Sequence, residues 1–500
     1  MELMTPLLII LCPAIAAALI LLSRNHPNIR EGWTIAASIA VFLLVMSMAP
    51  AILKGEAIKY ILFQPIFKGI YIGFKVDAFG EIFAITTSSL WILVSLYSIG
   101  YMRALNEHAQ TRYYFSFCFA ILGALGVALS ANLLTLFIFY EIITVSTYAL
   151  VIHEQTPEAL RAGHKYFAYL ITAGAFLLFG VMTTYHLTGT TEFTAGGIQA
   201  LGSAPRGIVI ILFFFFLLGF MKAAWMPFHS WLPTAMVAPS PVSALLHAVA
   251  VVKAGVFCIV RLVCYIFGVD LMHDLNLWLI LAIIAAFTML VGSFFAIAQD
   301  DLKKRLAYST ISQLSYIILG AALLTENGIR GAMLHIPFHG YMKITLFLCA
   351  GAIIAVTGKK KISEMAGIGK TMPMTMLAFS IAAIGMAGVP PVAGFISKLY
   401  LCLGAWAVVS PYGMIFLAVI LISSLLDIIY FFPIIHTAFF KKPEVEIGGS
   451  GEVKIKEAPL LIVIPLTITA IFSIVFFVYP NMFYILDLVN MAILNLFGGA

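Results

Sequence analysis

The sequence of 500 residues is 62% hydrophobic and only 10% charged, with a formal net charge of +6. Soluble domains carry about 25% charged residues, so this composition excludes an ordinary soluble protein and indicates a polytopic membrane protein. The chain contains no P-loop and no dinucleotide-binding fingerprint. Its six cysteines lie in apolar stretches without a CxxC pair, which gives no sign of an iron–sulfur, zinc or disulfide framework. We therefore expect no cofactor and no covalent chemistry in this chain.

A membrane-spanning helix needs about 20 apolar residues, and this rule predicts about fourteen spans in an all-α integral membrane protein. The expected spans are 3–22, 33–53, 77–101, 112–130, 132–153, 161–187, 207–237, 240–267, 273–298, 303–324, 328–357, 371–409, 411–440 and 458–480. The seventh and twelfth spans are too long for one straight helix and contain prolines, so we expect both to be broken. Residues 481–498 are apolar but short, and predict a helix on the membrane surface or against a partner.

Basic residues give the expected orientation. If alternate loops face opposite sides, most lysines and arginines fall on one side, and the positive-inside rule makes that side cytoplasmic. Both termini are then outside, in the plasma membrane of a prokaryote. The first apolar segment has no preceding basic residue and no clear cleavage site, so we expect a retained helix.

Four lysines lie inside apolar spans: Lys222, Lys253, Lys343 and Lys398. Each costs about 2.5 to 3.5 kcal/mol at the bilayer centre, so such residues are functional candidates by default. Lys222 and Lys253 flank a segment with four prolines between 227 and 241. Irregular backbone at membrane depth is tolerated only where protein or a wet cavity covers it. This arrangement predicts an ion path.

Glu141 lies near the middle of the fifth span, with apolar neighbours along the chain. A lone carboxylate there would be protonated unless a cation lies nearby, and Lys222 is the expected partner. The alternative is a purely structural buried pair. His247 precedes Lys253 by six residues, which is not a same-face spacing, so it is either a relay member or a hydrogen-bonded structural histidine.

His335, His339 and Lys343 follow one another at intervals of four residues in the eleventh span, so they share one helix face. Three titratable groups on one face inside a membrane are difficult to explain by packing and predict a proton relay. Lys398 follows the break in the twelfth span, and Asp427 lies in the thirteenth.

Spans four to eight and spans nine to thirteen show the same order, a broken helix followed by a span with a charged residue. Because five is odd, this predicts two five-helix repeats of inverted orientation. The expected divisions are three N-terminal helices at 1–111, the first repeat at 112–267, the second repeat at 268–440, and a loop, helix 14 and tail at 441–500.

Four stretches of the sequence resemble a known family: HSWLPTAMVAPSPVSALLHAVAVVKAG, DDLKKRLAYSTISQLSYIILG, HGYMKITLFLCAG and GVPPVAGFISK. They are similar to the antiporter-like subunits of respiratory complex I, of membrane-bound [NiFe] hydrogenases and formate hydrogenlyases, and of Mrp-type Na+/H+ antiporters. The resemblance implies inverted repeats, broken helices seven and twelve, and a hydrated axis of charged residues. It matches the axis to Glu141, Lys222, Lys253, His339, Lys343 and Lys398, and gives no role to Asp427.

The resulting hypothesis is a proton-translocating subunit of a redox-driven complex such as a membrane-bound hydrogenase. Its expected partners are other membrane-arm subunits, a second antiporter-like paralogue and an Fe–S/[NiFe] or quinone-linked redox module. The main alternative is the D-type subunit of a multisubunit Mrp Na+/H+ antiporter, which shares these motifs. A passive scaffold would have no use for four intramembrane lysines, and no polar pocket suited to a larger solute is evident.

Overall fold

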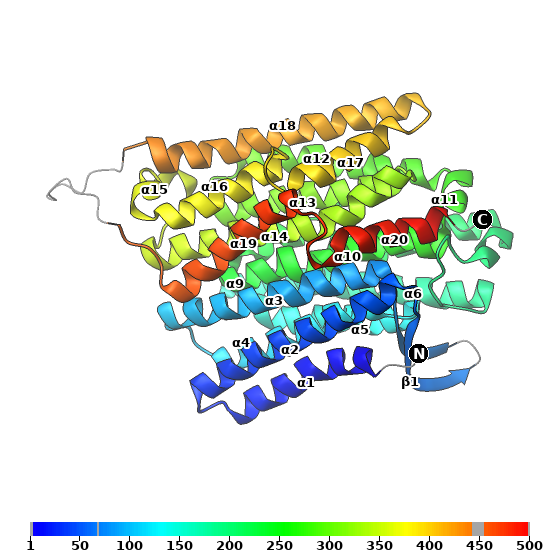
Figure 1. Ribbon diagram of the computed structural model, residues 1–500, viewed down its shortest axis with the longest axis horizontal. Coiled ribbons are helices and arrows are strands. Elements are labelled where there is room, and N and C mark those ends of the chain that lie inside the picture. The colour runs from blue at the N-terminus through cyan, green and yellow to red at the C-terminus, as the bar shows by residue number, and fades with distance from the viewer. Residues whose placement is uncertain (1–3, 68–69, 443–454, 499–500) are drawn as a thin grey trace, which may run out of the picture.

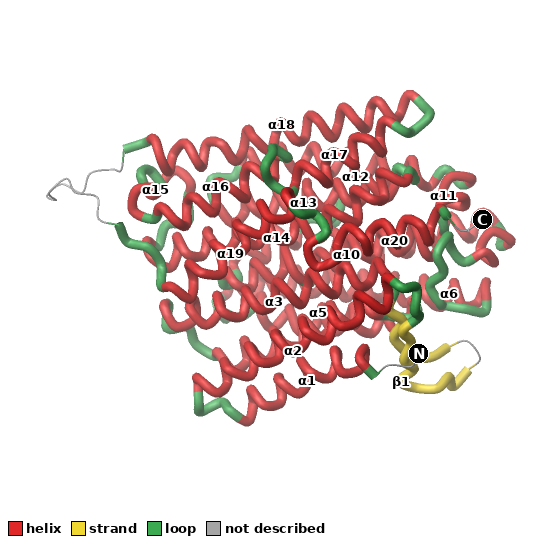
Figure 2. The backbone as a smooth tube through the Cα atoms, in the orientation of Figure 1, coloured by secondary structure: helices red, strands yellow, loops and turns green. Residues whose placement is uncertain are grey.

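Helices of the computed structural model, which describes residues 4–67, 70–442 and 455–498, run side by side along one common direction (Figures 1 and 2). Eleven described helices are long and apolar enough to cross a membrane. The chain is therefore a mostly helical multi-pass membrane protein. The other three expected spans fall on the two broken segments and on α13, whose polar residues lower its hydropathy. The count of fourteen remains a prediction.

The first six helices are the expected spans one to six, several of them shifted by a few residues. They are α1 (Thr5–Leu22), α2 (Pro27–Leu53), α3 (Ala78–Ala104), α4 (Gln110–Leu129), α5 (Leu133–Val151) and α6 (Pro157–Thr188). Three of them begin at a side-chain cap, since Asp77, Asn132 and Thr156 each accept a hydrogen bond from the backbone N–H three residues later. Such a bond satisfies one of the free N–H groups of a first helical turn.

The seventh span is broken, as predicted. α7 (Arg206–Gly219) ends at a short 3-10 turn, η2 (Met221–Ala223), which holds Lys222. Ala224 then adopts a left-handed conformation (φ 53°). Two short helices, α8 (Trp231–Thr234) and η3 (Ala235–Val237), then lead to the next span. Another short helix, η1 (Gln199–Ser203), lies before α7.

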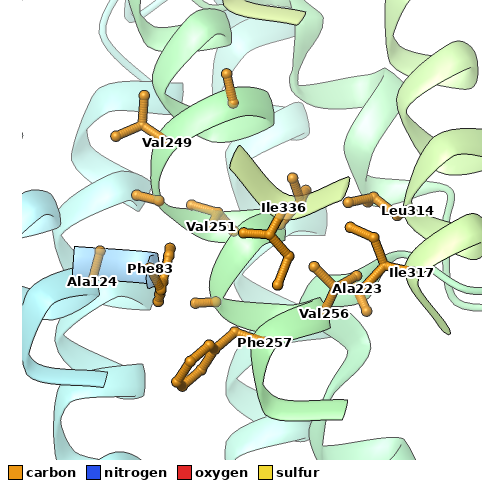
Figure 3. Packing of buried hydrophobic residues seen from close by; sticks show 14 of the residues in the cluster. Phe83, Ala124, Ala223, Val249, Val251, Val256, Phe257, Leu314, Ile317 and Ile336 are labelled. Carbon is orange, nitrogen blue, oxygen red and sulfur yellow. The ribbon is translucent and has the colours of Figure 1, made fainter. Parts of the chain in front are cut away.

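The eighth span is the centre of the molecule. α9 (Ser240–Ala244), η4 (Leu245–Val249), α10 (Val251–Arg261) and η5 (Leu262–Phe267) form it, and η4 and η5 are π-helical. Its most apolar 18-residue window is 100% buried. Figure 3 shows side chains of this span, among them Val251, Val256 and Phe257, surrounded by residues of other helices such as Phe83, Ile336 and Leu314. Lys253 therefore lies inside the protein, with no exposed surface.

The second half begins with four helices that lead to the second broken segment. α11 (Val269–Asp274) leads to α12 (Leu277–Ala298), α13 (Leu302–Ala322) and α14 (Glu326–Thr357). Then η6 (Ile362–Glu364) and α15 (Ile368–Thr371) precede the twelfth span, which is broken as predicted into α16 (Pro373–Ala387) and α17 (Gly394–Trp406). Gly388 ends α16 with φ 81°, and a Cβ there would lie 2.7 Å from Cδ of Lys398. Gly388 thus allows the helix to break and leaves space for the Lys398 side chain.

Three further elements complete the bundle: α18 (Pro411–Phe440), α19 (Leu460–Val478) and, after η7 (Met482–Tyr484), α20 (Ile485–Phe497). We expected the last helix on the membrane surface or against a partner. α20 packs against this chain with its face of Ile485, Leu488, Val489, Ala492 and Ile493. Its other face, with Leu494 and Phe497, is exposed, so contact with a partner stays a prediction. Part of the predicted 441–500 division, residues 443–454, lies outside the described residues.

Residues 54–76, expected to be a loop, form a β-hairpin of β1 (Ile58–Phe67) and β2 (Ile70–Val76), paired antiparallel. The hairpin was not predicted, because a search for long apolar runs does not detect the alternation of side chains along a strand. The hairpin and both chain ends lie at the same end of the bundle in Figure 1.

The opposite end gathers basic residues, and we call it the basic end; it comprises the α1–α2, α3–α4, α5–α6 and α12–α13 connections and residues 358–372. Contacts join these connections. Arg103 pairs with Glu31, Leu302 N–H donates to the Lys360 carbonyl, and Lys303 donates to the Ala238 carbonyl.

Candidate functional site

Every lysine expected inside the membrane is buried. Lys222, Lys253 and Lys343 have no exposed surface and Lys398 is 5% exposed. His247, His335, His339 and Asp427 are also fully buried. Since burial of a charge is costly unless polar groups compensate it, the partners of these side chains define what the site can do.

Lys222 is held by the fifth span. Its Nζ donates a hydrogen bond to the Tyr140 carbonyl at 2.6 Å and lies 3.2 Å from the centre of the Tyr140 ring. A carbonyl dipole and an aromatic face both stabilise an ammonium group. They leave it without a fixed counter-ion.

The expected contact between Glu141 and Lys222 is absent: no direct ion pair joins them, and both carboxylate oxygens of Glu141 are buried without a hydrogen-bond partner. Glu141 instead lies against α6, since a Cβ added to Gly174 would be 2.6 Å from its Oε1. Lys222 thus contacts Tyr140, whereas the Glu141 carboxylate lies beside Gly174, and residue spacing in the sequence cannot reveal this difference. Their interaction in this conformation is through space, without a hydrogen bond.

Lys253 makes a direct link to the eleventh span. Its Nζ is 2.6 Å from Nδ1 of His339. In this hydrogen bond one nitrogen donates and the other accepts. A single proton therefore lies between Lys253 Nζ and His339 Nδ1, on one nitrogen or the other. The His339 ring then lies 5.6 Å from the His335 ring at 24°, which confirms that the two histidines share a face.

His335 continues the connection toward the thirteenth span. Its Nδ1 is 2.8 Å from Ser397 Oγ and its Nε2 is 3.1 Å from Gln313 Oε1. The amide nitrogen of Gln313 in turn donates to Asp427 Oδ2 at 2.8 Å.

Asp427 is the hub of this network. Lys398 Nζ lies 2.7 Å from Asp427 Oδ2, the ion pair in the second half that we had expected in the first. The Tyr430 hydroxyl contacts the other carboxylate oxygen. Lys398 also donates to Ser424 Oγ at 3.1 Å and lies 4.5 Å from the centre of the Tyr316 ring.

Lys343 reaches the same hub by another route. Its Nζ donates to Ser309 Oγ at 2.8 Å, and Ser309 Oγ is 2.8 Å from the Tyr430 hydroxyl. Two polar residues of α13, Ser309 and Gln313, therefore supply hydrogen bonds to the relay. We call the second-half network the Asp427 network; its members are Lys253, His339, His335, Gln313, Asp427, Lys398, Tyr430, Ser309 and Lys343.

His247 is buried beside the ring of Phe347, 4.5 Å between centroids, and neither ring nitrogen has a hydrogen-bond partner. It lies in the π-helical turn η4, a type of distortion that is frequent at functional sites. It makes no contact with Lys253, so its relay role stays a prediction.

Sequence reasoning missed one strong pair and one buried acid. Arg261, counted as a loop residue, is 1% exposed and forms a bidentate ion pair with Asp77. Asp77 therefore both caps α3 and pairs with Arg261. Glu81, one turn along α3, is fully buried, and its two oxygens lack hydrogen-bond partners.

Gly255 allows α10 to approach Lys222. A Cβ at this position would lie 2.2 Å from the Ala223 nitrogen and 2.5 Å from the Lys222 carbonyl carbon. Because backbone atoms cannot yield as side chains do, Gly255→Ala is expected to displace the 3-10 turn and to destabilise the protein by about 1 to 3 kcal/mol. Thermal unfolding of the purified protein would measure this loss.

Gly340→Ala is the matched control, since its nearest neighbours would lie at an ordinary 3.4 Å. Equal unfolding temperatures for the two variants would contradict the close approach of α10 to Lys222.

Among the described residues, three cavities open at the basic end, and two of them have charged linings of both signs. One of about 590 Å³ is lined by residues such as Glu158, Lys165 and Lys304. The other, of about 440 Å³, is bordered by Glu107, Glu154, Lys303 and Lys360. Charged linings of both signs make these cavities suitable for water and ions.

Comparison with known proteins shows which family the chain resembles. Residues 130–426 match the family model described as NADH:quinone oxidoreductase/Mrp antiporter, TM. The chain is 33% identical over 441 residues to NADH-quinone oxidoreductase subunit N of Desulforudis audaxviator, covering 87% of this chain and 86% of that protein. It spans 53% of the length of several other curated relatives.

Solved structures share the fold. The chain superposes on a chain of the membrane-bound sulfane sulfur reductase, an archaeal respiratory membrane complex, with a TM-score of 0.85 and 27% identity. The match covers 99% of this chain and 98% of that chain. The chain also superposes on a chain of the Mrp complex from Dietzia sp. DQ12-45-1b with a TM-score of 0.86, 22% identity and coverage of 99% and 97%. At that identity the second likeness shows the fold alone.

Proposed function

Because the chain belongs to the NADH:quinone oxidoreductase/Mrp antiporter transmembrane family, we propose that it is the proton-translocating membrane subunit of a multisubunit redox-driven complex. The observation that carries the proposal is the Asp427 network, in which titratable side chains are linked across the interior of the second half. Four buried lysines cost about 10 kcal/mol of insertion free energy together, an expense that only a function explains.

In this mechanism the proton moves by coupled titration. Lys253 and His339 share a contact that accommodates one proton at a time. His335 and Gln313 connect that contact to Asp427, whose charge stabilises protonated Lys398. Each change of protonation shifts the charge that its neighbours face, so movement at one end biases the other.

The first half supplies the coupling. Lys222 has no fixed counter-ion, and Glu141 is close enough to interact with it only through space. Approach of the Glu141 carboxylate would favour protonated Lys222, and separation would favour release of the proton toward Lys253. The single 3-10 turn that holds Lys222 gives the lysine a support that can rearrange without unfolding a long helix.

We assign the partners and the orientation on the same basis. Glu141 borders an apolar cavity of about 480 Å³ between α4 and α5, beside the exposed Val145. An apolar surface at a titratable residue fits a neighbouring membrane subunit, such as a second antiporter-like paralogue. The redox module, iron–sulfur, [NiFe] or quinone-linked, is a separate partner. The basic end would face the cytoplasm of a prokaryotic plasma membrane, with both termini outside.

The decisive experiment is purification of the complex in mild detergent, followed by mass spectrometry and reconstitution into liposomes. We expect iron–sulfur, [NiFe]-type or quinone-reducing subunits to copurify, and proton uptake to follow electron transfer. Copurification of only small membrane subunits, with no electron-transfer partner, would overturn the redox-driven assignment.

The alternative is an Mrp-type Na+/H+ antiporter subunit, favoured by the fold shared with the Mrp complex chain. The same liposomes distinguish the two. In the antiporter reading, proton movement requires a Na+ gradient at fixed pH; in the redox-driven reading, it proceeds without Na+ once a reductant is added.

A further inference from the structure

Three metal-ligating side chains meet at the basic end, away from the Asp427 network. Glu107 and His108 lie in the α3–α4 turn, and His153 lies in the turn after α5. One ligand atom from each lies within 4.8 Å of those of the other two. His108 Nδ1 is 3.8 Å and His153 Nε2 is 3.9 Å from the same carboxylate oxygen of Glu107.

The orientation of the His108 ring is fixed by a hydrogen bond. Its Nε2 lies 2.9 Å from the His153 carbonyl oxygen, which can only accept. The ring proton is therefore on Nε2, and Nδ1, the atom toward Glu107, carries the lone pair. Histidines that bind metals almost always donate their other ring N–H to a carbonyl or carboxylate in this way.

His153 is the independent observation. Its side chain has no exposed surface, yet neither ring nitrogen has a hydrogen-bond partner. Buried polar groups are paired as a rule, so an unpaired buried imidazole facing a carboxylate calls for a ligand.

We propose that Glu107, His108 and His153 form a binding site for a divalent transition metal of the zinc type. Two imidazole nitrogens and one carboxylate oxygen, with a fourth position open to water, are a ligand set that zinc accepts. Calcium and magnesium prefer all-oxygen sites, so they do not fit this set.

Closure of the site needs only a small movement. Zinc binds such atoms at about 2.0 to 2.2 Å, so the three ligand atoms would move inward by roughly an ångström. The His108 side chain is 49% exposed, and it lies in a turn rather than in a helix, so it can move and also admits the ion.

The site adjoins the cavity of about 440 Å³ that Glu107 borders together with Glu154 and Lys303. A bound divalent cation would add positive charge at this opening.

The test uses the purified complex after removal of loosely bound metal with a chelator. Zinc uptake is measured by competition with a chromophoric chelator, and Co²⁺ is then added to record the strong visible absorption of a four-coordinate ion. We expect one zinc per chain that is lost, or weakened at least tenfold, in His108→Ala, together with loss of the Co²⁺ bands.

Because His153→Ala would remove a fully buried ring, the half-exposed His108 is the primary variant and His153→Asn the second. His273→Ala is the matched control, since His273 lies beside Asp274 but is 73% exposed and has no third ligand among the described residues. Equal zinc uptake and affinity in wild type and His108→Ala, or a loss that His273→Ala shares, would overturn the site.

Discussion

Replacement of Lys222 by methionine is expected to reduce proton translocation at least tenfold while the complex still assembles. Methionine fills the buried space beside Tyr140 but cannot carry a proton, and only a carbonyl and a ring lose their partner. Proteoliposomes that contain a pH-sensitive dye would report translocation, and gel filtration would report assembly.

Lys222→Arg separates charge from titration. Arginine keeps the positive charge but does not release its proton in proteins, so this variant is also expected to be inactive in translocation. Lys370→Met is the control, since Lys370 is exposed at the basic end. Normal translocation in Lys222→Arg would mean that Lys222 provides charge alone, and normal translocation in Lys222→Met would remove it from the path.

The helices and their breaks could be predicted because both depend on local sequence. Apolar runs of about 20 residues mark spans. Prolines mark the interruption that follows Lys222, and glycines with prolines mark the interruption before Lys398. The spacing of four residues between His335 and His339 likewise predicts their shared face, which the stacked rings confirm.

Contacts between helices could not be predicted in the same way. The sequence places Glu141 and Lys222 at similar depth but does not show which face each presents, and the two do not pair. The network around Asp427 could not be predicted from its neighbours in the sequence. Tyr430 lies one turn away on α18, but Lys398 and Gln313 come from α17 and α13.

The β-hairpin and the Asp77–Arg261 pair were overlooked for different reasons. Residues 58–76 hold two runs rich in isoleucine, tyrosine and phenylalanine around Lys68-Gly69, a signal for a hairpin, which a count of apolar spans discards. Arg261 lies near the end of a span and was assigned to a loop, because a charged residue close to an interface is usually solvated. Only the folded chain brings Asp77 to it.

The second large effect concerns the pair of Lys398 and Asp427. Asp427→Leu is expected to destabilise the protein by about 3 to 5 kcal/mol, since it leaves Lys398 charged and buried without a counter-ion. Lys398→Met is expected to cost less, because Asp427 keeps its contacts with Gln313 and Tyr430 and can take up a proton. Thermal unfolding of the purified complex would rank the variants.

The double variant Lys398→Met/Asp427→Leu is expected to recover most of the stability lost in Asp427→Leu, because no unpaired charge remains and apolar residues of similar size often replace a buried pair at little cost. Translocation is expected to stay abolished. This separation distinguishes the two uses of a buried ion pair: stability requires only that its charges match, whereas transport requires that they titrate. Additive losses of stability in the double variant would show that the two residues act independently, and restored translocation would exclude both from the proton path.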